Sequence, residues 1–184
     1  KQKSNEVTVN TKSNLNDLDY FSKTKLEIEK LIKDKLNNYS IYRLPLVLTN
    51  PAEASFIYNF PRNQVLEVVS DIDAGYMFSK AIDKIDLLNK KTFNVGGGEY
   101  SRIEGKYLMS KILSVYGVSS KYFASSLFLE KNHYSFIYKD SDKLNDILNY
   151  RNDSVDSFFL RLKRKSKSRK ISRFFGKLFM KRYK

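Results

Sequence analysis

The chain has 184 residues, of which 41% are hydrophobic and 14% aromatic, enough apolar material for the core of one domain. Cysteine is absent and His133 is the only histidine, so disulfides and cysteine nucleophiles are excluded, and we expect no metal site and no Ser-His-Asp triad. The sequence has no run of 18 apolar residues and no signal-peptide pattern, and its first residue is Lys. We therefore expect a piece of a longer, cytoplasmic protein.

The net charge of +14 is concentrated near the C-terminus. Residues 161–184 contain 12 Lys and Arg and no Asp or Glu, which leaves 22 basic and 20 acidic residues in 1–160. A nearly neutral body with a basic tail differs from a nucleic-acid-binding domain, whose basic residues lie on the folded body. We therefore expect no nucleic-acid partner for the body.

The N-terminal region is predicted to be a loop followed by a helix. Residues 1–16 are polar and lack helical periodicity, although a short extended piece is expected at Val7–Val9. Asn16 or Asp17 is a suitable N-cap. The helix is expected to extend from about residue 17 to Asn37.

One face of this helix carries an apolar row that contains a lysine. Positions i, i+4, i+7 and i+11 share a helix face, and here they are Phe21, Lys25, Ile28 and Ile32. A lysine in such a row either extends its ammonium to the edge of the core or serves a functional site. The opposite face is charged.

Two strands are expected after the helix. Residues 40–48 are rich in strand-forming residues, and Thr49-Asn50-Pro51 ends that run. The pattern then predicts a short helix at 51–60. Val65–Val69 is the second strand.

The second strand leads directly into another helix. Ser70 or Asp71 is expected to be its N-cap. Glu67, Asp71 and Asp73 are close in sequence, as the ligands of a metal can be. Capping and the favourable charge of the first turn explain the two aspartates without a metal, so we expect none.

A glycine-rich turn follows a further strand. Thr92–Val95 reads as the strand, Gly96-Gly97-Gly98 as the turn, and Ser101–Tyr116 as the next helix. Such a turn can bind phosphate at a helix N-terminus. The dinucleotide fingerprint is incomplete, because Ser101 occupies the third glycine position. We therefore interpret the segment as a tight strand-to-helix turn.

The C-terminal third contains four further predicted segments. These are extended runs at 122–129 and 134–138 and short helices at 140–148 and 154–162. The sequence thus divides into three parts. They are a loop at 1–16, a body at 17–160 and a basic amphipathic tail at 161–184.

Four landmarks occur in order along the body: Thr24-Lys25, Arg43-Leu44-Pro45, Asp73-Ala74 and Phe93-Asn94-Val95-Gly96-Gly97. Over about residues 5–163 they resemble the NAD(P)-dependent epimerase/dehydratase family of extended short-chain dehydrogenases. The resemblance implies an α/β fold, namely the C-terminal portion of a Rossmann-type parallel sheet with a small, mostly helical substrate lobe. The N-terminal nucleotide-binding strands of that fold are absent from this sequence.

The resemblance also implies roles for individual residues. In that family a helix carries Tyr-x-x-(Ser/Thr)-Lys, in which the Tyr is the general base and the Lys lowers its pKa and holds the nicotinamide ribose. Lys25 takes the lysine position and Phe21 the tyrosine position. Tyr20 is a candidate substitute, although one helical residue is a rotation of about 100°. The implied contacts are cofactor contacts by Lys25, Leu44 and Pro45 and substrate contacts by Leu46 and Arg62.

The function implied by the resemblance is that of an NAD(P)-dependent oxidoreductase acting on a nucleotide-sugar, in surface polysaccharide metabolism. The site is degenerate, because Phe21 has no hydroxyl and Leu46 stands where family members often carry Asn. NAD or NADP is expected to bind the complete protein and not, tightly, this chain alone. A homodimer is an assembly that the resemblance allows. Two alternatives stay open: a non-catalytic nucleotide- or partner-binding member of the same fold, and a basic module for membrane or nucleic acid.

The basic tail has an apolar stripe. Its members recur at helical spacing among Lys and Arg, and they are Ile171, Phe174, Phe175, Leu178 and Phe179. A basic amphipathic helix of this type binds anionic membrane. We expect residues 165–184 to attach the protein peripherally to the inner membrane face, with a solvated tail or an RNA-binding tail as the alternatives.

Overall fold

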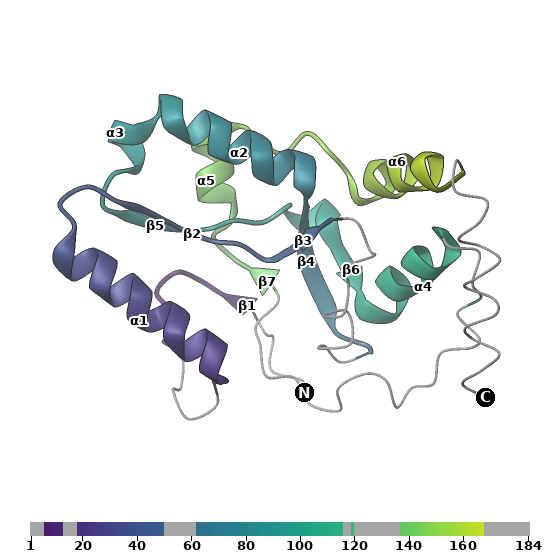
Figure 1. The fold of residues 1–184 in the computed structure, drawn as a ribbon, viewed down its shortest axis with the longest axis horizontal. Coiled ribbons are helices and arrows are strands. Elements are labelled where there is room, and N and C mark those ends of the chain that lie inside the picture. Colours follow the sequence, from purple (N-terminus) through teal and green to yellow (C-terminus); the bar gives the residue numbers. More distant parts are fainter. Residues whose placement is uncertain (1–5, 13–17, 50–61, 116–118, 120–136, 168–184) are drawn as a thin grey trace.

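The computed structural model describes residues 6–12, 18–49, 62–115, 119 and 137–167 (Figure 1). The helices are α1 (Tyr20–Lys35), α2 (Asp71–Asp83), α3 (Ile85–Leu88), α4 (Gly105–Val115), α5 (Asp142–Leu148) and α6 (Val155–Lys167), with a 3-10 turn at Glu99–Ser101. The strands are β1 (Glu6–Val7), β2 (Ser40–Arg43), β3 (Leu46–Leu48), β4 (Val65–Ser70), β5 (Lys91–Asn94), β6 (Arg102–Glu104) and β7 (Ile137–Tyr138). The predicted α/β class is confirmed.

The run predicted as one strand at 40–48 is two strands with different partners. β2 pairs in parallel with β5, with Ile41 opposite Thr92, whereas β3 pairs in parallel with β4. The break falls at Leu44-Pro45, because proline has no N–H to give to a strand ladder. In Figure 1 the chain passes directly from the β2–β5 pair into the β3–β4 pair.

The helix predicted from Ser101 begins later than expected, at Gly105. The residues between them form the 3-10 turn and then β6, which pairs antiparallel with β4. Ile103 lies opposite Leu66, and both side chains are buried. Burial of Ile103 against β4 therefore overrides the local helical pattern. In addition to the β2–β5 and β3–β4 pairs, β1 pairs in parallel with β7.

The N-cap of α2 is a predicted residue, whereas the N-cap of α1 is not. The Ser70 hydroxyl accepts a hydrogen bond from the Asp73 amide at 3.1 Å, as expected of the α2 cap. The cap of α1 is Asp19, whose carboxylate accepts from the Ser22 amide at 2.7 Å. The predicted caps Asn16 and Asp17 lie outside the described residues, and α1 is shorter than the predicted 17–37.

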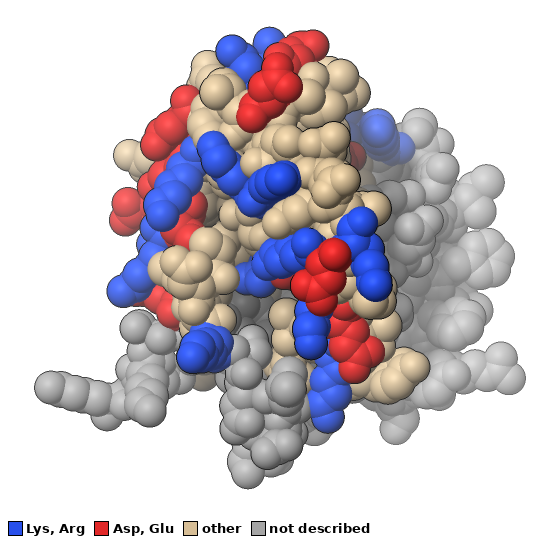
Figure 2. Space-filling view, turned by 90° about the vertical axis from the view of Figure 1, so that its left-hand side faces the viewer, with Lys and Arg blue, Asp and Glu red and all other residues tan. Residues whose placement is uncertain are grey.

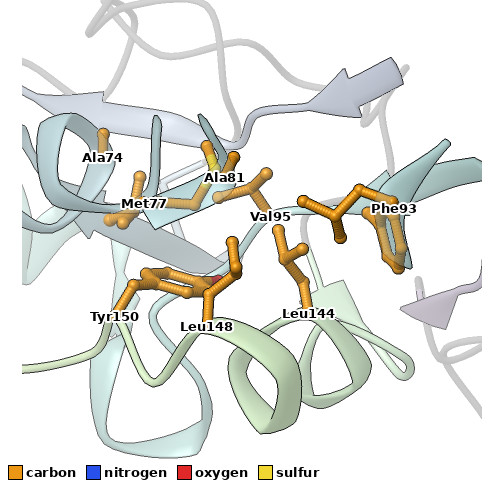
Figure 3. Close-up of a cluster of buried hydrophobic side chains, with 10 residues drawn as sticks. Ala74, Met77, Ala81, Phe93, Val95, Leu144, Leu148 and Tyr150 are labelled. Atoms are coloured by element: carbon orange, nitrogen blue, oxygen red, sulfur yellow. The ribbon is translucent and has the colours of Figure 1, made fainter. Parts of the chain in front are cut away.

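Strand β4 separates two apolar cores. Because successive side chains of a strand point to opposite faces, Val68 packs in a cluster with α4 and α6, and Val69 packs in a second cluster with α2 and α5. The first cluster includes Leu66, Leu108, Phe158 and Phe159. The second, drawn in Figure 3, includes Met77, Phe93, Val95, Leu144 and Tyr150.

Helix α6 crosses the boundary expected between body and tail at residue 161. It continues to Lys167, and Leu162 packs against the first core. None of the helices in the described ranges is long and apolar enough to span a membrane. The predicted helix at 51–60, the extended run at 122–129, His133 and the tail stripe from Ile171 to Phe179 lie outside the described residues.

Candidate functional site

The face of α1 that carries Phe21 and Lys25 lies on the surface of the described structure. Helix α1 has no buried residue, and Phe21 is 67% exposed and Ile28 43% exposed. The Lys25 ammonium lies 5.2 Å from the centroid of the Phe21 ring, which is a cation–π contact. Phe21 and Lys25 therefore lie side by side on one face of the helix, as the sequence pattern predicts. This face does not pack against either apolar core of the described structure.

Tyr20 is placed differently from Phe21. Its side chain is 85% exposed, and its carbonyl accepts a hydrogen bond from the Thr24 hydroxyl at 2.9 Å. Within the described ranges, Lys25 makes its cation–π contact with Phe21 and has none with Tyr20. The helix thus brings together the two positions that the resemblance pairs, and Tyr20 is outside that pair.

Glu29 and Arg43 attach α1 to strand β2. The Arg43 guanidinium donates from Nε and Nη2 to the two carboxylate oxygens of Glu29, both at 2.7 Å, and from Nη1 to the Val9 carbonyl at 3.1 Å. This two-pronged geometry is the strong form of an Arg–carboxylate pair. The hydrogen bond with Glu29 also raises the pKa of Arg43. This pair fixes α1 on the sheet one turn after Lys25, because Lys25 and Glu29 are four residues apart and share a helix face.

The Arg-Leu-Pro landmark continues into the link between β2 and β3. Leu44 is 38% exposed and Pro45 is half-buried. Leu46, expected on the substrate side, packs against the first core. Arg62, the other expected substrate residue, lines a cavity beside β6 and α4.

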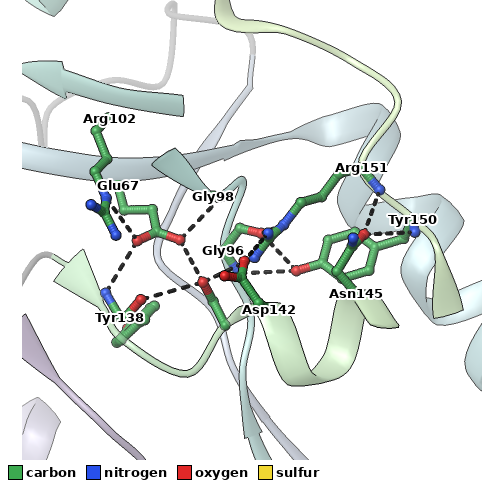
Figure 4. A network of polar contacts seen from close by, with 10 residues as sticks. Glu67, Gly96, Gly98, Arg102, Tyr138, Asp142, Asn145, Tyr150 and Arg151 are labelled. Atoms are coloured by element: carbon green, nitrogen blue, oxygen red, sulfur yellow. Dashed lines mark hydrogen bonds and ion pairs between the residues drawn. The ribbon is translucent and has the colours of Figure 1, made fainter. Parts of the chain in front are cut away.

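A buried carboxylate occupies the glycine turn. Glu67 is fully buried on β4, and its carboxylate accepts from the Gly98 amide at 3.2 Å, the Tyr138 amide at 3.2 Å and the Ser141 hydroxyl at 2.8 Å (Figure 4). A Cβ atom on Gly96 would overlap this carboxylate. The chain's own carboxylate therefore fills the turn, which is tight as predicted. The turn joins β5 to the 3-10 turn and β6, so its interpretation as a strand-to-helix turn is wrong.

Tyr150 and Arg151 hold the same turn from the other side (Figure 4). The Tyr150 hydroxyl donates to the Gly96 carbonyl at 2.6 Å and accepts from the Gly96 amide at 3.1 Å. Arg151 donates to the Gly96 carbonyl at 2.8 Å and to the Ser141 hydroxyl at 2.9 Å. Burial raises the pKa of Tyr150, which keeps its phenol neutral. No local sequence pattern predicts this network, because its bonds to β4 and the turn join residues 31 to 74 positions apart.

The carboxylates considered for a metal have other partners. Asp73 accepts from the Asn152 and Asp153 amides, each at 3.0 Å, and burial raises its pKa. Asp71 Oδ1 lies 3.5 Å from Nη2 of Arg161. The Nη1 of the same arginine lies 2.5 Å from Oδ1 of Asp153. In the described part of the chain, no group of three His, Cys, Asp or Glu side chains is arranged to hold a metal ion.

The charges on the end of the molecule that carries α1 and α3 are mixed. Figure 2 shows that face with Lys and Arg interspersed among Asp and Glu. A nucleic-acid-binding surface gathers its basic residues into a patch or stripe. This face has no such large patch of one sign.

No protein-family model matches the chain, and no curated protein matches it.

Proposed function

We propose that the chain is the C-terminal part of an NAD(P)-dependent epimerase/dehydratase-like protein that acts on a nucleotide-sugar. In this proposal α1 is the helix of a degenerate Tyr-x-x-x-Lys site, with Phe21 in the tyrosine position and Lys25 in the lysine position. The strands β2 and β5 belong to a Rossmann-type sheet. The remaining helices form a small substrate lobe.

The observation that carries the proposal is the exposed pair of Phe21 and Lys25 on α1. The lysine ammonium lies over the Phe21 ring and has no carboxylate within ion-pair distance among the described residues. The helix is fixed by Glu29 and Arg43 to β2, a strand in a parallel pair, as in α/β proteins that bind ligands at the carboxyl ends of their strands. An ammonium that no described carboxylate engages has donors for the hydroxyl groups of a ribose.

The residues present suit the ribose of a nicotinamide cofactor, but no residue at the tyrosine position can act as the general base. When bound, the cofactor supplies hydride transfer. Lys25 would hold the ribose by hydrogen bonds from its ammonium, and Leu44 and Pro45 would supply the apolar contacts to the cofactor. Phe21 carries no proton to exchange, so a contribution of about 10²–10⁴ in rate from a positioned general base is missing.

The second candidate is a non-catalytic member of the same fold that binds a nucleotide or a partner. It is favoured by Phe21 and by Tyr20, which is 85% exposed and makes no cation–π contact with Lys25. Both candidates require a Gly-x-x-Gly-x-x-Gly turn after an initial strand, in sequence upstream of Lys1. A membrane or nucleic-acid module does not require it, so the upstream sequence separates these classes first.

Turnover of nucleotide-sugars by the protein extended to include that turn separates the two candidates. A degenerate enzyme should act slowly, and Phe21→Tyr should raise its rate because the hydroxyl is restored beside Lys25. Tyr20→Phe is the matched control and should change little. Loss of turnover in Tyr20→Phe alone would show that Tyr20 is the base and that our register is wrong, and no turnover by either wild type or Phe21→Tyr would favour the non-catalytic candidate.

A further inference from the structure

We propose that the cavity beside β6 and α4 binds an anionic small molecule that carries a ring. The cavity has a volume of about 620 Å³, within the range of about 300–1,000 Å³ that is usual for ligand pockets. The lining residues that carry the argument are Arg62, Tyr100, Arg102, Lys106, Tyr107 and Asp156. No residue of α1 is among the described lining residues, so the proposal does not depend on the cofactor site, whereas Arg62 is also the residue expected from the resemblance to contact the substrate.

Arg62 is held at the cavity by backbone hydrogen bonds. Its carbonyl accepts from the Lys106 amide at 2.8 Å, and the Gln64 carbonyl accepts from the Gly105 amide at 2.9 Å. These bonds join the segment before β4 to the first turn of α4. The backbone at Arg62 is therefore fixed beside the cavity, and its guanidinium makes no hydrogen bond or ion pair with the described residues.

Arg102 has hydrogen-bond donors that no described residue accepts. It lies opposite Glu67 in the β4–β6 pair, with Nε 3.6 Å from the carboxylate. The carboxylate already accepts from Gly98, Tyr138 and Ser141, and within the described residues the buried Nε of Arg102 has no hydrogen-bond partner. An arginine has five donors arranged as a fork. Its buried Nε lies beside Glu67, so the Nη groups are the donors left for an anion in the cavity.

The acidic residues of the cavity do not compete for these arginines. Glu104 pairs with Lys106 at 2.9 Å, and Asp156 pairs with Lys111 at 2.7 Å. In the described part of the chain, Arg62 has no carboxylate within ion-pair distance. The pairing of Glu104 with Lys106 neutralises both groups, so the cations left to the cavity are Arg62 and Arg102, which favours an anionic ligand.

The rest of the wall suits a ring. Tyr100 is 98% exposed and Tyr107 is 53% exposed, and aromatic side chains of this size are natural stacking surfaces. The buried residues Ile103 and Met109 supply the apolar part of the wall. Tyr100 lies in the 3-10 turn before β6, and in Figure 1 β6 leads directly into α4, which carries Tyr107 and lies below α6. The chemistry recognised is a phosphoryl or carboxylate group attached to a ring.

Calorimetric titration of the 184-residue chain tests the proposal with three probes: inorganic pyrophosphate, citrate and ADP. We expect saturable binding of an anion, with pyrophosphate and citrate deciding between phosphoryl and carboxylate recognition. ADP should bind more tightly than pyrophosphate, because its rings can stack on the tyrosines. Absence of saturable binding for all three probes would overturn the proposal, and equal affinity for ADP and pyrophosphate would overturn its ring component.

Substitutions locate the binding in the cavity. Arg62→Gln and Arg102→Gln should each raise the dissociation constant about tenfold or more, as expected for loss of a charge-assisted hydrogen bond. The control is Arg164→Gln, which removes the same charge from an exposed position on α6 and should change it less than twofold. Equal weakening in all three would show general charge attraction and contradict the proposal. Arg62 makes no contact with Glu67, so its variant decides the outcome if Arg102→Gln unfolds the chain.

Discussion

Glu67 and Ser141 are 74 residues apart in sequence and are joined by a 2.8 Å hydrogen bond in the interior of the protein. Through this bond, and those from Gly98 and Tyr138, one carboxylate links β4, the glycine turn, β7 and the start of α5. The arrangement is structural, because all of these donors come from the chain itself. It fixes the turn that precedes β6 and the cavity.

Replacing Glu67 by Gln should destabilise the protein. One carboxylate oxygen would become an NH₂ group that faces other donors, so the free energy of unfolding should fall by about 2–3 kcal/mol, as for a buried group that loses its partners. Urea unfolding measures this. Glu27→Gln, on the exposed face of α1, is the control and should stay within about 0.5 kcal/mol of wild type; a similar small effect at Glu67 would contradict the role of this network.

The two glycines Gly96 and Gly75 should respond to alanine in opposite directions. A Cβ at Gly96 would overlap the Glu67 carboxylate, so Gly96→Ala should lower the free energy of unfolding by about 1–3 kcal/mol. A Cβ at Gly75, within α2, would have no atom within 4 Å. Gly75→Ala should therefore raise stability by about 0.5–1 kcal/mol through helix propensity. Thermal unfolding of both variants checks the contrast, and a stable Gly96→Ala protein would refute the close packing of the turn.

Stability should fall as the pH rises above about 10. Burial raises the pKa of Tyr138 from 10.0 to about 12, so in this window the unfolded chain loses a proton that the folded chain retains. Folding is then disfavoured by rising pH, and the loss is complete above the folded pKa. Tyr42 and Tyr150, whose pKa values burial also raises, add to the same slope.

The Tyr138→Phe variant isolates this contribution. Urea unfolding from pH 9 to 12 should show a shallower loss of stability than in wild type. Tyr100→Phe is the control, because Tyr100 is 98% exposed and its removal should leave the slope unchanged. A slope that is the same in all three proteins would show that Tyr138 titrates normally.

How far the sequence predicted the structure depends on the range of the interaction involved. The α1, β4 and α5 segments and the Ser70 cap are set by local periodicity and capping, and they appear close to where the pattern placed them. Pro45 marks locally where the strand breaks, but the new partner of β3 is β4, which is distant in sequence. Strand β6 also depends on pairing with β4, and this pairing overrides a local helical pattern.

The candidate sites follow the same rule. The shared face of Phe21 and Lys25 is a local property of one helix, and the structure has it. The pairing of Glu29 with Arg43 and the Glu67 network join separate elements, so only the fold reveals them. The cavity with Arg62 and Arg102 likewise exists only because β6 pairs with β4.

The tail is expected to bind anionic membrane through Phe174, Phe175 and their neighbours. Co-sedimentation of the chain with phosphatidylserine vesicles should be strong, and removal of residues 168–184 should abolish it while leaving α6 intact. Phe174→Ser with Phe175→Ser keeps every charge and should weaken partition strongly, because the apolar stripe supplies the insertion. Equal partition of the full and truncated chains would reject membrane attachment by the tail.

The central claim is that Lys25 holds a nicotinamide cofactor, and the binding of NAD(H) and NADP(H) to the extended protein measures it most directly. Lys25→Ala should raise the dissociation constant by about tenfold or more, since an ammonium that hydrogen-bonds the ribose would be lost. Lys30→Ala, which removes the same charge from the opposite, exposed face of α1, should have little effect.

The 184-residue chain alone should bind either cofactor only weakly, because its sequence lacks the phosphate-binding fingerprint. Calorimetry with the chain, the extended protein and the two lysine variants therefore gives a complete set of outcomes. The account predicts tight binding by the extended protein and by Lys30→Ala, and weak binding by Lys25→Ala and by the chain alone. Micromolar binding by the chain alone, or equal affinity of Lys25→Ala and wild type, would contradict it.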